Sequence, residues 1–269
     1  MYRIARRSVM IAAVVLTVQG QVAHGHEFWI EPSMANIVPG GILAAELKVG
    51  RMLAGEAFPY LSDRFERFTV TAAGGTRPVS GTDGNLPAVS IRTQASDLHV
   101  LAHQTVPFRA TYTDWDLFGQ FLEEEDLPEI AAWHRARGLD ASNFAERYIR
   151  YAKALVPVGK LEPDAQDQPL GMAFEIVAED LPFSPETESF TVRLLRNGAP
   201  VAHRRVSLFH SDQSKPVERI TFETDARGKV VLPLLGSGRY LISSVMIDPA
   251  NAPPVVWQSH WASLTFLLD

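Results

Sequence analysis

The chain has 269 residues and a formal net charge of −6, and it contains no cysteine. The lack of cysteine excludes disulfide bridges, thiolate metal ligands, a cysteine nucleophile and a lipid-anchored N-terminal cysteine. The acidic balance argues against nucleic acid or an anionic membrane surface as the main partner, and it suits a protein that handles cations.

Residues 1–25 have the pattern of a secretory signal peptide. Three arginines lie near the start, residues 9–18 form a short apolar run, and Ala23 and Gly25 are small residues at the −3 and −1 positions of a cleavage site. Removing this leader leaves 244 residues with 22 basic and 31 acidic side chains, a net charge of −9. No later segment reaches the ~18 consecutive apolar residues of a membrane helix, so we expect an exported, periplasmic protein that does not span the membrane.

The predicted cleavage site lies beside two histidines. Cleavage after Gly25 would make His26 the first residue, and its α-amine and imidazole could then chelate one metal ion. Cleavage after Ala23 would instead expose His24-Gly25-His26, whose amine, two amides and third imidazole form the square-planar nitrogen set that Cu(II) and Ni(II) prefer. The alternative is that a histidine near this junction is incidental.

Residues 26–112 are expected to form a β-sandwich of short strands. Alternating apolar residues and Gly- or Pro-containing turns delimit the strands. The expected extended segments are 28–49, interrupted by a turn at Pro39-Gly40-Gly41, then 67–72, 85–91 and 97–104.

Two histidines share one face of the predicted strand 97–104, opposite three apolar side chains. Because each strand residue rises ~3.3 Å, His99 and His103 would stand about 13 Å apart, too far to share one ion. At most one of them could join His26 in a site. The competing interpretation is that at least one of the two faces solvent.

Between residues 113 and 160 the apolar period becomes helical. Apolar side chains recur at spacings of three and four over 117–122, and a proline-initiated helix is expected over 128–137. A third helix is expected from Ser142 to Leu155, where aromatic and apolar residues recur at similar spacings.

Two polar features of this region have explanations other than a metal-binding site. The acidic run 123–126 is interpreted as a solvated helix end, because consecutive carboxylates on a helix point in different directions. His134 is interpreted as a surface residue or as a charge near a helix C-terminus.

Residues 161–168 have the composition of a linker, and residues 169–269 return to a strand pattern. Asn197-Gly198 between two alternating runs predicts a β-hairpin. In the last expected strand, 255–268, His260 shares the more apolar face, where a histidine is either a hydrogen-bonded core residue or a ligand at the sheet margin. The expected strands are 172–178, 189–196, 199–209, 220–224, 229–234, 239–246 and 255–268. We expect these to form a second sandwich.

No other catalytic pattern is present. The sequence lacks Gly-x-Ser-x-Gly, His-Glu-x-x-His, a phosphate-binding loop and the Rossmann glycine pattern.

Six segments together resemble one protein family. In chain order they are His26–Pro32, Leu98–Ala102, Arg150–Leu155, Thr224–Gly228, Gly238–Leu241 and Trp257–Phe266. They resemble the bacterial periplasmic domain family of unknown function described as the periplasmic component of nickel or cobalt ABC-type uptake systems. The resemblance implies a secreted, mostly β protein with a transthyretin-like or Cna-B-like C-terminal sandwich and a role in handling transition metals. Members of that family often have a histidine where this chain has Met246 and Ile247, so any site that uses that histidine is altered here.

These observations predict a mostly β protein of two sandwiches joined by a short helical insertion. We expect it to bind a divalent transition metal ion, Ni, Co or Cu, through His26 and Glu27, with His99, His103 or His260 completing the ligand set. Binding is expected rather than catalysis. An inner-membrane metal transporter or an outer-membrane receptor is the expected partner.

Two further hypotheses belong to other classes. The first is a copper enzyme with an N-terminal histidine brace, for which Trp29 and Tyr60 are the nominal axial aromatic residues. The second is an envelope interaction or adhesion module that binds no metal, since sandwich domains serve many functions.

Overall fold

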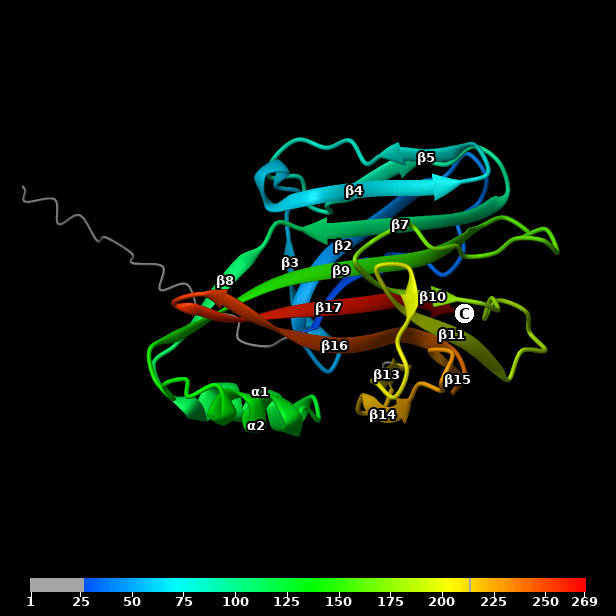
Figure 1. The fold of residues 1–269 in the computed structure, drawn as a ribbon. Helices are drawn as coiled ribbons and strands as arrows, with labels where there is room; N and C mark the ends of the chain where they lie inside the picture. Colours follow the sequence, from blue (N-terminus) through cyan, green and yellow to red (C-terminus); the bar gives the residue numbers. More distant parts are fainter. Residues whose placement is uncertain (1–26, 213) are drawn as a thin grey trace, which may run out of the picture.

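The computed structural model describes residues 27–212 and 214–269, and the fold is mostly β (Figure 1). The expected fold class is therefore confirmed. The helices of the described chain are α1 (Trp115–Glu124), α2 (Pro128–Ala136) and a 3₁₀ turn (Ser62–Arg64). The strands are β1 (Glu27–Pro32), β2 (Ile42–Arg51), β3 (Ala54–Phe58), β4 (Phe65–Ala72), β5 (Gly75–Pro78), β6 (Val89–Arg92), β7 (Asp97–Thr105), β8 (Phe108–Tyr112), β9 (Phe144–Val158), β10 (Phe174–Ala178), β11 (Ser189–Arg196), β12 (Ala199–Pro200), β13 (Arg205–Ser211), β14 (Glu218–Glu223), β15 (Lys229–Pro233), β16 (Gly238–Ala252) and β17 (Val255–Leu268).

Nine strands form one central sheet that runs through the whole molecule. Its order is β14-β13-β16-β17-β9-β7-β4-β5, and β8 pairs with the first residues of β9. Strand β17 is antiparallel to β16 and parallel to β9, so the last strand lies in the middle of the sheet (Figure 1). Strands from both halves of the chain therefore share this sheet.

A smaller sheet covers each face of the central sheet. The N-terminal sheet contains β1, β2, β3 and β6, and its apolar side chains pack with Leu101, Ala152 and Val156. The C-terminal sheet contains β10, β11, β12 and β15, and it packs on the opposite face, with Val100 and Leu155. Middle strands of the central sheet are consequently buried on both sides, as sandwich layers require.

The helix expected from Ser142 to Leu155 is wrong, because residues from Phe144 onward form strand β9. Both faces of this strand are covered, so apolar residues occupy alternate positions on each face and the simple period of two disappears from the sequence. The aromatic and β-branched residues Phe144, Tyr148, Ile149 and Val156 suit an extended backbone.

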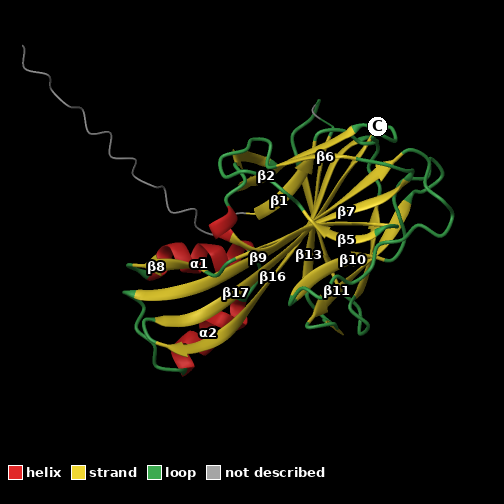
Figure 2. Cartoon of the chain, turned by 90° about the horizontal axis from the view of Figure 1, so that it is seen from above, coloured by secondary structure: helices red, strands yellow, loops and turns green. Residues whose placement is uncertain are grey.

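The two helices cover a part of the central sheet that the small sheets leave open. They pack on the far ends of β8, β9, β16 and β17, away from the C-terminus (Figure 2). Phe118, Phe121 and Ile130 form the buried face of the helix pair. They pack in one cluster with Trp257 and Trp261 of β17. Neither α-helix of the described chain is long and apolar enough to cross a membrane.

A buried ion pair between Lys153 and Asp167 holds the segment 161–168 on the central sheet. Lys153 lies between apolar neighbours on β9, and its Nζ donates to both carboxylate oxygens of Asp167 at 2.7 Å. Both side chains are fully buried. Asp167 also accepts the backbone N–H groups of Gln168 and Ala178, so its oxygens are well supplied with donors. A buried charge is tolerated only with such partners.

Candidate functional site at the start of β1

The first predicted metal ligand, His26, lies outside the described residues. The next residue, Glu27, begins β1, where it pairs with Gly50 of β2. Strand β1 is held on the central sheet because the Ser263 hydroxyl donates to the carbonyl of Phe28 at 2.7 Å. Glu27 is thus fixed in the body of the fold.

Glu27 is buried in a cluster of charged residues that we call the N-terminal junction, formed by Glu27, Arg51, Glu124, Glu125 and Arg219. Burial raises the pKa of Glu27 above its ordinary value, and the charge of Glu124 raises it further. Burial also raises the pKa of Glu125 to about 7, with a further contribution from the charge of Glu27. Two carboxyl groups of the junction therefore hold protons more tightly than carboxyl groups in water.

Arginines balance part of this negative charge at the end of α1. Arg51 pairs with Glu124 at 2.6 Å, and Arg219 pairs with Glu125 at 3.4 Å. Arg205 and Arg219 also donate to the main-chain carbonyl of Glu124, at 3.1 and 3.2 Å. Cations at a helix C-terminus satisfy the carbonyls that the helix leaves free. The end of α1 is thereby brought against β13 and β14, close to the start of β1.

His103 lies close to β1, but its ring is surrounded by aromatic side chains. Its ring centroid is 5.1 Å from that of Phe28, 5.4 Å from Phe65 and 4.8 Å from Phe68. Its Nδ1 has no hydrogen-bond partner among the described residues. Burial lowers the pKa of His103 to about 3, so the ring is neutral at pH 7. Because side chains alternate along a strand, Phe28 faces His103 while Glu27 points to the other side of β1.

We expect stability to fall in acid because of His103. In the unfolded chain its pKa is about 6.5, so between about pH 6.5 and 3 the unfolded state binds a proton that the folded state does not. The contribution is complete above pH 6.5 and is lost as the pH falls, by about 1.4 kcal/mol per pH unit. Urea unfolding at pH 7 and pH 4.5 should show wild type losing about 2–3 kcal/mol more than His103→Leu, since all other titrating groups are common to both. An equal loss in the two proteins would contradict this.

His99 is also buried, on the same side of β7 as His103. Burial lowers the pKa of His99, and its Nδ1 lies 3.5 Å from the carbonyl oxygen of Asp97. The interpretation that at least one of these histidines faces solvent is wrong. The N-terminal sheet covers this face, which a single strand pattern does not reveal.

His260 lies on the opposite face of the central sheet, beneath the C-terminal sheet. Its Nδ1 is 3.1 Å from the Tyr151 hydroxyl, and its Nε2 is 3.0 Å from Nη2 of Arg196 and 3.5 Å from Asp248. Because the guanidinium can only donate, Nε2 accepts from it and Nδ1 carries the ring proton. His260 is therefore a hydrogen-bonded core residue that links β9, β11 and β16.

The structure does not bring the predicted histidine ligands together. His99 and His103 face one small sheet and His260 faces the other, with the central sheet between them. Within residues 27–212 and 214–269, no three His, Asp or Glu side chains converge where they could hold a metal ion. Of the predicted set, Glu27 lies near two other carboxylates, those of Glu124 and Glu125.

Trp29 and Tyr60, the nominal axial residues of a copper brace, both form other contacts in the core. Trp29 is buried, and its Nε1 donates to Glu31 at 3.0 Å. Tyr60 packs on the rings of Phe65 and Phe68, within 6.0 Å.

The structure differs from the sequence-based interpretation at Glu125, expected at a solvated helix end, and at His134, expected at the surface or as a charge near a helix C-terminus. Glu125 belongs to the acidic run 123–126, yet its side chain is only 13% exposed. His134 is buried, accepts from Nε1 of Trp257 at 3.0 Å and donates to the carbonyl of Asp140 at 2.9 Å.

Comparison with known proteins gives a family but no function. No curated protein matches the chain. Among matching solved structures is the "D0-D1 domain of Intimin", which is 12% identical, with 88% of this chain and 97% of that chain covered and a TM-score of 0.21. The family model described as "Domain of unknown function (DUF4198)" matches residues 23–248. The chain is therefore a member of the DUF4198 family.

Proposed function

We propose that this is an exported periplasmic protein that binds a divalent transition metal ion, Ni, Co or Cu, at its processed N-terminus and serves as an accessory component of metal uptake. The observation that carries the proposal is the buried carboxylate pair of the N-terminal junction. The charge of Glu27 adds to the raised proton affinity of Glu125, and Glu27 directly follows the predicted terminal residue, His26, in the sequence.

The chemistry of the junction fits a cation. Two partly buried carboxyl groups with raised pKa values lose an unfavourable interaction when a positive charge arrives, so a metal ion would displace their protons. The α-amine and imidazole of His26 would supply nitrogen donors, and Glu27 and Glu125 would supply oxygen donors. Nitrogen-rich ligation with no thiolate suits Ni(II), Cu(II) and Co(II).

The arginines of the junction have a defined role in this proposal. Arg51 and Arg219 hold Glu124 and Glu125 in place at the end of α1, and they limit the negative charge before metal arrives. His99, His103 and His260 are not part of the proposed site. His103 contacts Phe28 on the side of β1 opposite Glu27, His99 shares the face of β7 with His103, and His260 lies on the other face of the central sheet.

The test is calorimetry with Ni(II), Cu(II) and Co(II) on protein that begins at His26 and on protein with six residues added before it. The longer extension moves the α-amine too far from the His26 imidazole for the two to chelate one ion, and it avoids a histidine at the third position, so affinity should fall by at least about tenfold. Affinity should rise with pH through about 7, because binding releases the proton of Glu125.

A matched pair of variants tests the carboxylate. Glu125→Gln should weaken binding by about tenfold, whereas Glu123→Gln, on an exposed neighbour in the same acidic run, should leave it unchanged. Equal affinity of the processed and extended proteins would overturn the terminal-amine proposal. Failure of both to retain any metal would favour an envelope interaction module instead.

A further inference from the structure

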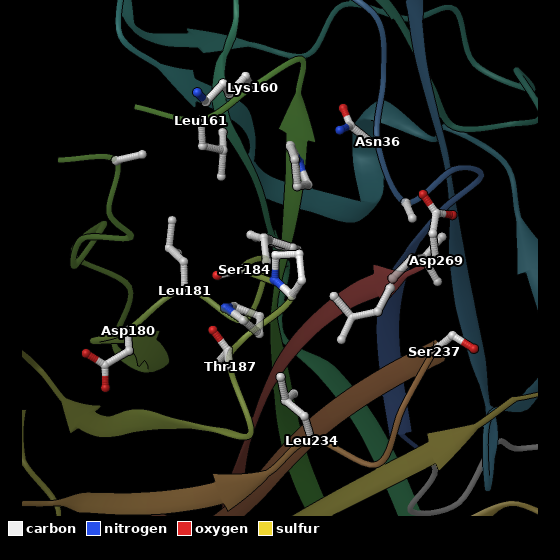
Figure 3. A pocket seen from close by; sticks show the side chains of 18 of the residues that line it. Asn36, Lys160, Leu161, Asp180, Leu181, Ser184, Thr187, Leu234, Ser237 and Asp269 are labelled. Atoms are coloured by element: carbon white, nitrogen blue, oxygen red, sulfur yellow. The ribbon is translucent and has the colours of Figure 1, made fainter. Parts of the chain in front are cut away.

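A large cleft opens at the end of the molecule opposite the helices. It has a volume of about 1410 Å³ and lies between the segments 159–165 and 180–188, next to the end of β17 (Figure 3). Small-molecule pockets are usually about 300–1,000 Å³, so this cleft suits a longer, extended ligand.

Leucine and proline side chains form the apolar part of the cleft lining. Leu161, Leu181 and Leu234 extend into the cleft (Figure 3), and Leu268 also lines it. Four prolines contribute to the lining, at positions 157, 163, 182 and 185. Proline restricts the backbone, so less conformational entropy is lost when a ligand binds.

The rim is strongly acidic. Glu162, Asp180, Glu188 and Asp269 line the cleft with exposed side chains, and Lys160 is the sole basic residue among the described lining residues. Within the described chain these four carboxylates form no ion pair. Glu179, by contrast, is paired with Arg193 and Lys229.

The apolar surface continues beyond the cleft. The loop that supplies Ala35 and Asn36 to the lining also exposes Met34 (56%) and Val38 (73%). Exposed apolar side chains that cluster beside a cleft mark an interaction surface more often than scattered ones do.

We infer that this cleft binds an extended peptide segment of a partner protein in which basic and apolar side chains alternate. In an extended peptide, successive side chains point to opposite sides. Apolar side chains would contact the leucines of the lining, and lysine or arginine side chains would reach the acidic rim, where a low-dielectric wall strengthens the negative potential. The inference is independent of the metal site, which lies at the start of β1.

The experiment measures fluorescence anisotropy of a labelled seven-residue peptide of alternating lysine and leucine, with chelator-treated full-length protein. The test variant combines Glu162→Gln, Asp180→Asn and Glu188→Gln. The control combines Glu56→Gln, Asp116→Asn and Glu218→Gln, which remove the same charge from exposed positions elsewhere. The test variant should weaken binding by about tenfold and the control by less than about twofold. Raising the salt concentration should weaken binding to wild type.

Three results would overturn the inference. One is the absence of binding up to about 1 mM peptide, and another is an equal effect of the two triple variants. The third is equally tight binding of spermine, a cation without apolar side chains, because the leucines of the lining would then contribute nothing. A peptide with glutamate in place of lysine should not bind.

Discussion

Replacing Lys153 by methionine is expected to lower the free energy of unfolding by about 3–5 kcal/mol. The substitution leaves the carboxylate of Asp167 fully buried without its cation, although Gln168 and Ala178 still donate to it. An uncompensated buried charge is among the most destabilising changes that a point mutation can make. Urea unfolding at pH 7 measures the effect, and thermal unfolding should show a midpoint lower by about 10 °C.

An exposed ion pair provides the comparison for this variant. Arg51 and Glu124 are 59% and 40% exposed, so Arg51→Ala should cost less than about 1 kcal/mol. The double variant Lys153→Met with Asp167→Asn should be less destabilised than the sum of the two single variants, because the second change removes the orphaned charge. A loss from Lys153→Met no larger than that from Arg51→Ala would show that the buried pair does not stabilise the fold.

Trp257→Ala is the second change with a large expected effect, about 3–5 kcal/mol. Trp257 is fully buried beneath the helix pair, its Nε1 donates to His134, and the Arg137 guanidinium lies 4.8 Å from its ring centroid. Truncation therefore opens a cavity and removes the contact that fixes α2 on β17. Alongside urea unfolding, limited proteolysis should show faster cleavage between residues 115 and 137.

Trp257→Phe separates the packing from the hydrogen bond. Phenylalanine retains most of the buried ring but leaves Nδ1 of His134 without its donor, which should cost about 1–3 kcal/mol. Trp133→Ala, on a tryptophan of the same helix pair that is 47% exposed, should change stability by less than about 0.5 kcal/mol. Similar losses at Trp133 and Trp257 would contradict the packing described here.

Alternation and turn residues were enough to predict many of the strands. The segment 97–104 is β7, and Asn197-Gly198 forms the hairpin turn between β11 and β12, with Leu195 paired to Pro200. Strand β9 was missed because both of its faces are covered. Its apolar residues fall at spacings of three and four as well as two, and a helix fits that pattern equally well.

The site was harder to predict than the strands, since it depends on which faces become covered. His99 and His103 were correctly placed on one face of β7, but the sheet that buries them is specified by residues far away in the chain. The sequence predicts a solvated Glu125, because the ion pair that this residue forms is with Arg219, 94 residues further along the chain. Pairings at such separations leave no periodic signal in the local sequence.

The position of β17 bears on how the polypeptide can reach its folded state. It pairs with β16, which directly precedes it in the sequence, and with β9, which lies about 110 residues earlier in the sequence. Until Val255–Leu268 have been synthesised, β9 has an unprotected edge along most of its length, and such an edge can pair with other chains. The central sheet therefore cannot be completed before Val255–Leu268 are available, so we expect chains that lack this segment to aggregate or to depend on a chaperone.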